Sequence, residues 1–228
     1  MARIKSDFLI HLPQGMDTKK AMYIGTAGYT AMLMVMTLEE AGVTPGSGPI
    51  LVTGATGGVG GTAVAILNKL GFEVTALTRS RQPSIHEYLQ KIGAREVVCG
   101  EEWTRPPAPL ESQKWAGAID TIGSMVLARI LAEMKYGGCV AACGLAAGFD
   151  LPTTVMPFIL RGVSLRGVDS VSCPTPRRKA AWERLVTDIT DEALATINTV
   201  IPLAEVPRYA KELLAGNITG HVVVDVNA

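Results

Sequence analysis

The chain has 228 residues, of which 48% are hydrophobic and 18% are charged, and its 21 Lys and Arg balance its 21 Asp and Glu. This composition excludes intrinsic disorder, because it supplies enough apolar surface to bury a sizeable core. The zero net charge excludes the broadly basic surface that nucleic acid requires, so we expect no nucleic-acid partner.

No targeting or membrane-spanning segment is predicted. Residues 1–8 carry basic side chains but no apolar stretch behind them, unlike a signal peptide. The most apolar run, residues 31–36, is far shorter than the ~20 residues that cross a bilayer. The four Cys are too few for a disulfide framework in a chain of this length. We therefore expect a cytoplasmic protein with reduced thiols and no membrane partner.

Predicted helices and strands follow one another along the chain. Asp17 or Thr18 caps a first helix that runs to Glu40. From Pro49 onward, short apolar strands alternate with helices. The predicted strands cover residues 50–53, 73–78, 96–99, 116–120, 139–143 and 163–168. The predicted helices after the first cover residues 58–70, 84–91, 124–135, 174–189 and 203–214, and a final strand covers residues 221–226.

Strands that are apolar throughout and separated by helices indicate a parallel sheet covered on both faces. Six strands in this rhythm predict an α/β fold with a doubly wound, six-stranded Rossmann sheet and short flanking segments. We divide the chain into an entry segment with a linking helix (1–45), a dinucleotide-binding Rossmann domain (46–190), and a C-terminal helix with a last strand (191–228).

A glycine-rich turn follows the first predicted strand. Residues 53–60 read T-G-A-T-G-G-V-G, which fits G-x-G-x-x-G with Ala55 in the first place. Gly57 lets the backbone approach a pyrophosphate, and Gly60 lets the helix lie close to the strand. The helix then offers free N–H groups and its positive dipole end to the phosphates. The strand and helix on either side favour a dinucleotide site over a purely structural turn.

The same letters fit T-G-x-x-x-G-x-G, the loop of the short-chain dehydrogenases. That family needs a Tyr with a Lys four residues later, whereas Tyr88 precedes Lys91 by three and Tyr209 precedes Lys211 by two. Its loop also begins the chain, whereas this loop begins at Gly54. We therefore exclude that family.

The end of the second strand distinguishes NADPH from NADH. NAD sites place Asp or Glu there, which bonds the ribose 2′-hydroxyl and repels a 2′-phosphate. Here the residues are Thr78, Arg79, Ser80 and Arg81, which offer two guanidinium groups, two hydroxyls and no carboxylate. Such groups suit a phosphate, so we predict NADP(H) as the cofactor. The alternative is a loop of solvated charges.

Longer stretches of the sequence resemble one family. G-T-A-G-Y-T-A at residues 25–31 and G-A-T-G-G-V-G at residues 54–60 are similar to medium-chain dehydrogenase/reductases of the zinc-free quinone-oxidoreductase branch. Four further stretches resemble the NADPH-dependent acrylyl-CoA reductases in particular. They are W-A-G-A-I-D-T at 115–121, Y-G-G-C-V-A-A-C-G-L at 136–145, L-P-T-T-V-M-P-F-I-L-R at 151–161 and G-V-D-S at 167–170.

This resemblance implies an NADPH-dependent oxidoreductase that acts on a C=C bond. Hydride would reach the β-carbon of acrylyl-CoA, and protonation at the α-carbon would give propionyl-CoA. The resemblance also implies residues for the pyrophosphate, the 2′-phosphate and the nicotinamide end. The pyrophosphate residues are Thr56, Gly57, Gly58 and Val59. The 2′-phosphate residues are Thr78, Arg79 and Ser80, and the residues at the nicotinamide end are Leu145, Leu160 and Ser170. Residues 79–85 form a longer loop than the family usually has, which leaves the 2′-phosphate ligands open.

Members of the family also have a barrel-like lobe that forms the other wall of the active site. The sequence starts at the crossing into the Rossmann domain, and residues 219–226 resemble the strand that returns to the lobe. We therefore expect this chain to bind NADPH but to reduce nothing by itself. Two alternatives remain, an NADPH quinone or enone reductase and a non-enzymatic NADPH-binding protein that acts through a partner.

No catalytic residue and no metal ligand are predicted. His11, His86 and His221 are scattered, and His86 is interpreted as a helix-surface residue. Asp120, at the tip of the fourth strand, either borders the cofactor or caps the next helix. The sequence has no C-x-x-C and no paired His, which zinc sites usually need. The edge strand at 163–168 has unpaired backbone groups, so we expect a homodimer through this edge.

Overall fold

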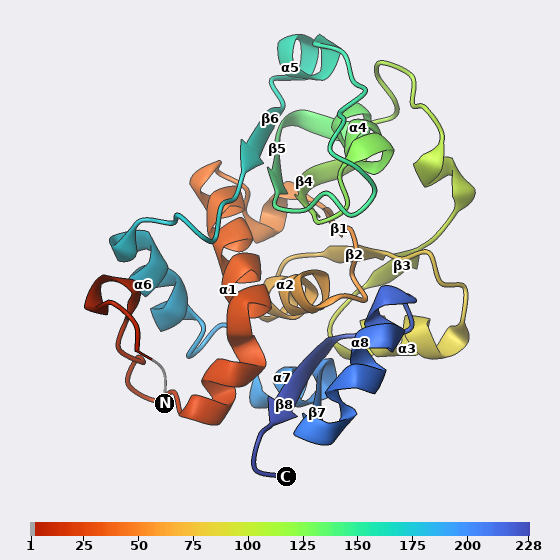
Figure 1. The fold of residues 1–228 in the computed structure, drawn as a ribbon. Coiled ribbons are helices and arrows are strands. Elements are labelled where there is room, and N and C mark those ends of the chain that lie inside the picture. Colours follow the sequence, from red (N-terminus) through yellow and green to blue (C-terminus); the bar gives the residue numbers. More distant parts are fainter. Residues whose placement is uncertain (1–2) are drawn as a thin grey trace.

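A six-stranded sheet lies at the centre of the structure, a computed structural model that describes residues 3–228 (Figure 1). Its strands are β1 (Ile50–Val52), β2 (Val74–Leu77), β3 (Glu96–Val98), β4 (Trp115–Asp120), β5 (Met134–Ala142) and β6 (Ser164–Gly167). Their order is β3-β2-β1-β4-β5-β6, and every neighbouring pair is parallel. The chain moves outward from β1 to β3, returns to β4 beside β1, and moves outward again to β6. The predicted doubly wound Rossmann sheet is confirmed.

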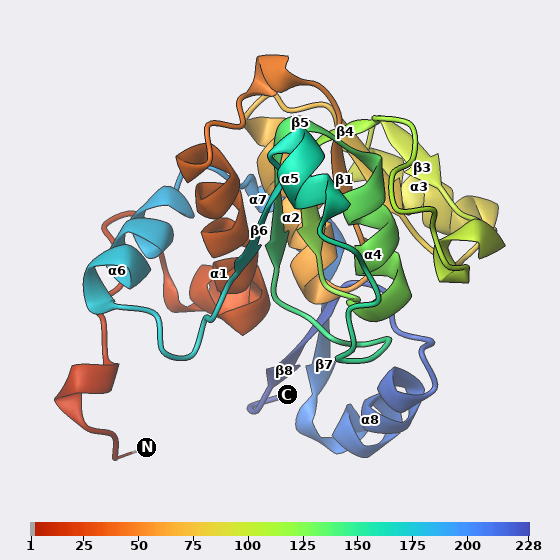
Figure 2. The same cartoon turned by 90° about the horizontal axis from the view of Figure 1, so that it is seen from above.

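Helices cover both faces of this sheet. The helices of the described chain are α1 (Thr18–Glu40), α2 (Gly58–Lys69), α3 (Pro83–Lys91), α4 (Ser124–Glu133), α5 (Met156–Arg161), α6 (Thr175–Arg184), α7 (Asp191–Ile197) and α8 (Val206–Leu214). In β1, Ile50 and Val52 belong to the core beneath α1 and α2, whereas Leu51 belongs to the core beneath α4. Successive side chains of a strand point to opposite faces, so a strand between two layers of helices must be apolar throughout. Figure 2 shows α1 and α2 on one side of the sheet and α4 on the other.

The helix α1 begins and ends as the sequence predicts. The Asp17 carboxylate accepts a hydrogen bond from the Lys20 backbone N–H at 2.6 Å, so Asp17 is the cap and Thr18 the first helical residue. Inside the helix, Gly25 has φ 51° and ψ −157°, a conformation that glycine adopts readily. Of the described helices, α1 alone is long and apolar enough to cross a membrane, and most of that stretch is buried within the fold.

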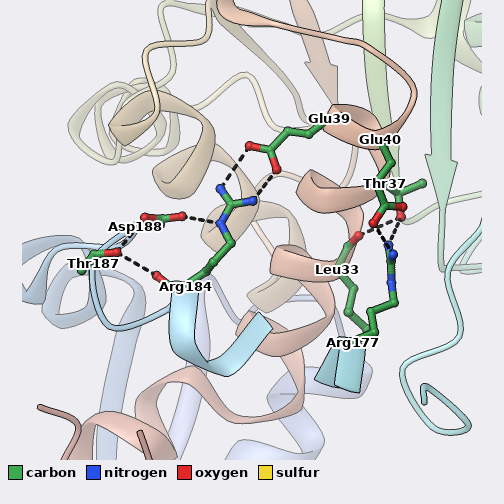
Figure 3. Close-up of polar contacts among 8 residues, drawn as sticks. All are labelled: Leu33, Thr37, Glu39, Glu40, Arg177, Arg184, Thr187 and Asp188. Carbon is green, nitrogen blue, oxygen red and sulfur yellow. Dashed lines mark hydrogen bonds and ion pairs between the residues drawn. The ribbon is translucent and has the colours of Figure 1, made fainter. Parts of the chain in front are cut away.

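Two arginines of α6 attach this helix to the end of α1 (Figure 3). Arg184 forms ion pairs with Glu39 of α1 and with Asp188, the latter at 2.7 Å. Arg177 forms an ion pair with Glu40 and donates a hydrogen bond to the Thr37 hydroxyl at 3.0 Å. The hydrogen bond with Glu39 is the main cause that raises the pKa of Arg184. These bonds hold α6 across the carboxyl end of α1.

The structure differs from the sequence prediction mainly after β4. The fourth helix ends at Glu133, and β5 begins at once with Met134, whose partner in β4 is Trp115. Helices α5 and α7 were not predicted. A strand β7 (Asn198–Pro202) was also missed, and it pairs in parallel with β8 (His221–Asp225) as a second, two-stranded sheet. Each missed helix has at most seven residues, which is too short to show a helical period.

The predicted division into three parts stays a prediction, and its first two residues lie outside the described part of the chain. The main hydrophobic core crosses both proposed boundaries. Ile24 and Leu33 of α1 and Leu194 and Ile197 of α7 are buried together with residues of the central sheet. The linking helix and α7 therefore pack as parts of the Rossmann core.

Candidate dinucleotide site

The carboxyl ends of β1 and β4 lie side by side where the strand order reverses. Ligands of open α/β sheets bind in the crevice at this point. Asp120, at the end of β4, is fully buried and accepts hydrogen bonds from the Thr53 hydroxyl at 2.8 Å and from the N–H groups of Ile122 at 3.3 Å and Gly123 at 2.8 Å. Burial raises the pKa of Asp120, and these three bonds oppose the rise. The carboxylate thus joins the ends of two strands and the turn before α4, which supports its structural interpretation.

The glycine loop packs directly beneath the first turn of α2. A methyl group on Gly60 would lie 2.3 Å from the Gly54 carbonyl oxygen and 2.9 Å from the Ala55 Cα, so no side chain fits there. A methyl group on Gly57 would have only the Gly54 oxygen nearby, at 3.4 Å. Gly60 is therefore required by the packing of helix against strand. Gly57 instead borders open space, as expected for the position that a pyrophosphate approaches.

The amino terminus of α2 is equipped to bind an anion. Its N-cap is Gly57, no side chain caps it, and its first turn has no acidic residue. Within the described chain, the N–H groups of Val59 and Gly60 have no hydrogen-bond acceptor, while Gly57 forms an isolated parallel β-bridge with Gly220. Free backbone donors at the positive end of a helix are what a pyrophosphate needs. The residues present therefore fit the phosphates of a dinucleotide.

The start of β8 also reaches this loop, which the sequence did not predict. The Gly220 N–H donates a hydrogen bond to the Thr56 carbonyl at 2.7 Å. The next residue, His221, packs beside Gly25 and Gly58, and its Nδ1 lies 2.8 Å from the Asn198 Oδ1. Burial lowers the pKa of His221, and a hydrogen bond with the Tyr23 backbone opposes this shift. The segment that leads into β8 thus supports the glycine loop from outside the central sheet.

The predicted 2′-phosphate loop follows β2. Thr78 is buried, and its hydroxyl accepts a hydrogen bond from the Ser80 N–H at 3.1 Å. Ser80 is half-buried, whereas Arg79 and Arg81 are exposed. No hydrogen bond or ion pair engages either guanidinium group within the described residues. The loop therefore presents two free cationic groups at the edge of the site.

His86, interpreted from the sequence as a helix-surface residue, makes a contact that the sequence did not predict. It is half-buried, and its Nε2 lies 3.0 Å from the Ser80 carbonyl oxygen. The carbonyl can only accept, so Nε2 carries the proton and donates it. A tertiary contact of this kind, between a helix and the loop before it, leaves no periodic signal in the sequence.

The three residues predicted at the nicotinamide end lie in two separate places. Leu145 follows β5 and is exposed, and Ser170 follows β6 and is half-buried, so both stand at the carboxyl edge of the sheet. Leu160 is on α5, whose Arg161 donates a hydrogen bond at 3.1 Å to the Met134 carbonyl at the start of β5. Figure 2 shows α5 at the end of β6 that lies away from β7 and β8. The structure does not bring Leu160 to the other predicted residues. Its helix, α5, precedes β6 and lies at the amino ends of the strands, whereas Leu145 and Ser170 lie at the carboxyl ends.

Burial also affects the thiols near the site. Cys139 in β5 is fully buried, and burial raises its pKa. Cys143, just after β5, has its pKa raised to about 11 by burial and by the charge of Asp120. Both thiols are therefore protonated at neutral pH and are weak nucleophiles.

Comparison with known proteins identifies the family. Residues 58–189 match the family described as zinc-binding dehydrogenase. The acrylyl-CoA reductase AcuI of Ruegeria pomeroyi is 50% identical over 228 residues, which cover 100% of this chain and 68% of that protein. The chain belongs to the acrylyl-CoA reductase family of medium-chain dehydrogenase/reductases. The resemblance stated from the sequence is confirmed.

Solved structures of relatives have the same fold. Escherichia coli K-12 YhdH with bound NADPH is 56% identical with a TM-score of 0.95, covering 99% of this chain and 69% of that one. Bacillus subtilis yhfP with NAD bound is 46% identical with a TM-score of 0.93, covering 99% of this chain and 68% of that one. Despite the family description, no group of three or more His, Cys, Asp or Glu in the described residues could hold a metal ion.

Proposed function

We propose that this chain is the NADPH-binding domain of an enoyl-thioester reductase that converts acrylyl-CoA to propionyl-CoA. One observation carries the proposal. The free N–H groups at the start of α2 and the Arg79–Arg81 loop border the same edge of the sheet, so a pyrophosphate and a 2′-phosphate each have donors there. The acrylyl-CoA reductase relative at 50% identity supports the thioester substrate.

The work of this chain in the reaction is to hold and orient the cofactor. NADPH supplies the hydride for the β-carbon of the enoyl thioester. Gly57 would let the pyrophosphate approach the backbone. The free N–H groups in the first turn of α2, which begins with Gly58 and Val59, would hold it, and they are already fixed by the helix and need no reorganisation. Thr78, Arg79 and Ser80 would hold the 2′-phosphate, as a carboxylate could not. The Asp120 carboxylate keeps the ends of β1 and β4 together, which steadies the turn from which the glycine loop begins.

A quinone reductase is the second candidate, because the Bacillus subtilis relative YhfP, 46% identical, bears a quinone oxidoreductase name. A chimera separates the two candidates. The part of the Ruegeria pomeroyi protein that this chain does not match is joined to this chain, and NADPH oxidation is followed with acrylyl-CoA and with a quinone. The proposal expects a higher kcat/KM for acrylyl-CoA. A higher value for the quinone would favour the second candidate, and NADPH binding without turnover would favour a non-enzymatic role.

We also propose a cytoplasmic homodimer that forms through the edge of the sheet. Within the described residues β6 pairs only with β5, so its outer backbone groups are free to pair with another strand. Apolar side chains in the segments just before and after β6 are exposed, among them Ile159 at 73% and Val171 at 90%. Exposed apolar surface of this kind marks an interaction site. Light scattering that shows a monomer at high concentration would contradict the dimer.

A further inference from the structure

We propose that His86 is a positioning residue for the 2′-phosphate loop and sets the preference for NADPH over NADH. The inference rests on the proposed function, since it concerns the same cofactor site. It starts from Ser80, the central residue of the loop between β2 and α3. All three of its polar groups have partners in the chain: its N–H binds the Thr78 hydroxyl, its Oγ accepts from the Gln82 N–H at 3.2 Å, and its carbonyl accepts from His86 at 3.0 Å.

The His86 bond is the one that comes from outside the loop. The bonds with Thr78 and Gln82 span two residues each and follow the loop wherever it moves. His86 lies on α3, whose next buried residue, Leu89, is fixed in the main core. The imidazole is half-buried and therefore has little rotamer freedom to lose when it donates this bond. His86 thus attaches the loop to the rigid part of the fold.

Fixing the Ser80 carbonyl also fixes the donors of the loop. The peptide bond to Arg81 is trans, so the Arg81 N–H points opposite to the Ser80 carbonyl, away from His86. Because the Ser80 Oγ already accepts from Gln82, its own proton is free to be donated. The side chains of Arg79 and Arg81 leave the backbone on either side of this fixed residue. A 2′-phosphate would meet a hydroxyl and a backbone N–H that are already oriented, with a free guanidinium group on either side.

The contact predicts an effect on NADPH alone. NADH has a 2′-hydroxyl where NADPH has a phosphate, so disorder of this loop should lower the affinity for NADH only slightly. A net contribution of one hydrogen bond corresponds to roughly a threefold to tenfold change in affinity. His86→Asn is too short to reach the Ser80 carbonyl, whereas His86→Gln places an amide N–H near the position of Nε2. The two variants are otherwise matched in polarity, and His11→Asn is a control for loss of an exposed imidazole far along the chain.

The test is a fluorescence titration of NADPH and NADH on the parent and the three variants, with a thermal unfolding midpoint for each. We expect His86→Asn to bind NADPH about threefold to tenfold more weakly with NADH unchanged, and His86→Gln to recover most of the loss. The inference would be overturned if the affinities for NADPH and NADH fell equally, or if His86→Asn and His86→Gln had the same ratio of NADPH to NADH affinity. The proposed function would still stand in either case, provided that the parent prefers NADPH. A parent that does not prefer NADPH would overturn both.

Discussion

Two glycines of the same loop should respond to the same substitution in different ways. Gly57→Ala adds a methyl group whose nearest neighbour is a carbonyl oxygen at 3.4 Å, an ordinary contact. Its φ of −88° is open to any residue. We therefore expect the free energy of unfolding to change by less than about 1 kcal/mol, the size of an N-cap effect. The methyl group nevertheless stands where the pyrophosphate must approach the backbone, so NADPH binding should weaken by at least about tenfold.

Gly60→Ala should damage the fold itself. The added methyl group would lie 2.3 Å from the Gly54 oxygen and 2.7 Å from the Gly54 carbonyl carbon, both backbone atoms that have no rotamer to change. Relief requires α2 to move away from β1, which separates buried side chains such as Ala63 and Val64 from the sheet. Overpacking of this kind costs about 1–3 kcal/mol or more. We expect both the unfolding midpoint and NADPH binding to fall.

The assay is urea unfolding followed by circular dichroism, together with NADPH titration, for both variants and for Gly46→Ala. Gly46 is exposed, with no atom within 4 Å of an added methyl group, and serves as the matched control. The reasoning is refuted if Gly57→Ala binds NADPH like the parent, or if Gly60→Ala keeps the parental stability. The first result would mean that the pyrophosphate does not approach the backbone at Gly57, and the second that the packing of α2 against β1 does not depend on Gly60.

Three further predictions concern single side chains. Arg79→Ala should weaken NADPH at least tenfold and leave NADH nearly unchanged in titrations, since a charge-assisted hydrogen bond contributes roughly 1.5–3 kcal/mol; equal losses would be inconsistent with a phosphate contact. The Tyr88 hydroxyl is buried with no partner among the described residues, so Tyr88→Phe should keep or raise the unfolding midpoint, and a clear fall would reveal a missed partner. Burial lowers the pKa of His221 in the folded protein below its ordinary value of 6.5. The neutral imidazole therefore contributes its full stabilisation above pH 6.5, and this contribution is lost as the pH falls through the folded pKa. Unfolding midpoints between pH 8 and 5 should fall more steeply for the parent than for His221→Gln, and parallel curves would refute this.

The sequence alone predicted the features that depend on neighbouring residues. The apolar run of β1, the glycine loop and the apolar helix after it are contiguous, so their spacing predicted both the sheet and the turn proposed to hold the phosphates. The cap at Asp17 was likewise local. The absence of a carboxylate after Thr78 was read directly from the chain.

Contacts between distant segments could not be predicted in this way. Gly220 meets Thr56 across more than half the sequence, and β7 pairs with β8 although α8 lies between them. The His86 contact needs the turn between β2 and α3 to be known in three dimensions. Leu160 was grouped with the nicotinamide end by resemblance, but the path of the chain before β6 places it at the other edge of the sheet.

The central claim is that the amino terminus of α2 and the loop after β2 together bind NADPH. Its most direct test is an equilibrium titration of this chain with NADPH and with NADH, followed by the fluorescence of the reduced nicotinamide. The account predicts saturable binding of both cofactors, with NADPH at least tenfold tighter because only NADPH carries the phosphate that Arg79 and Ser80 would hold. Equal affinity for the two, or no binding of NADPH, would contradict it.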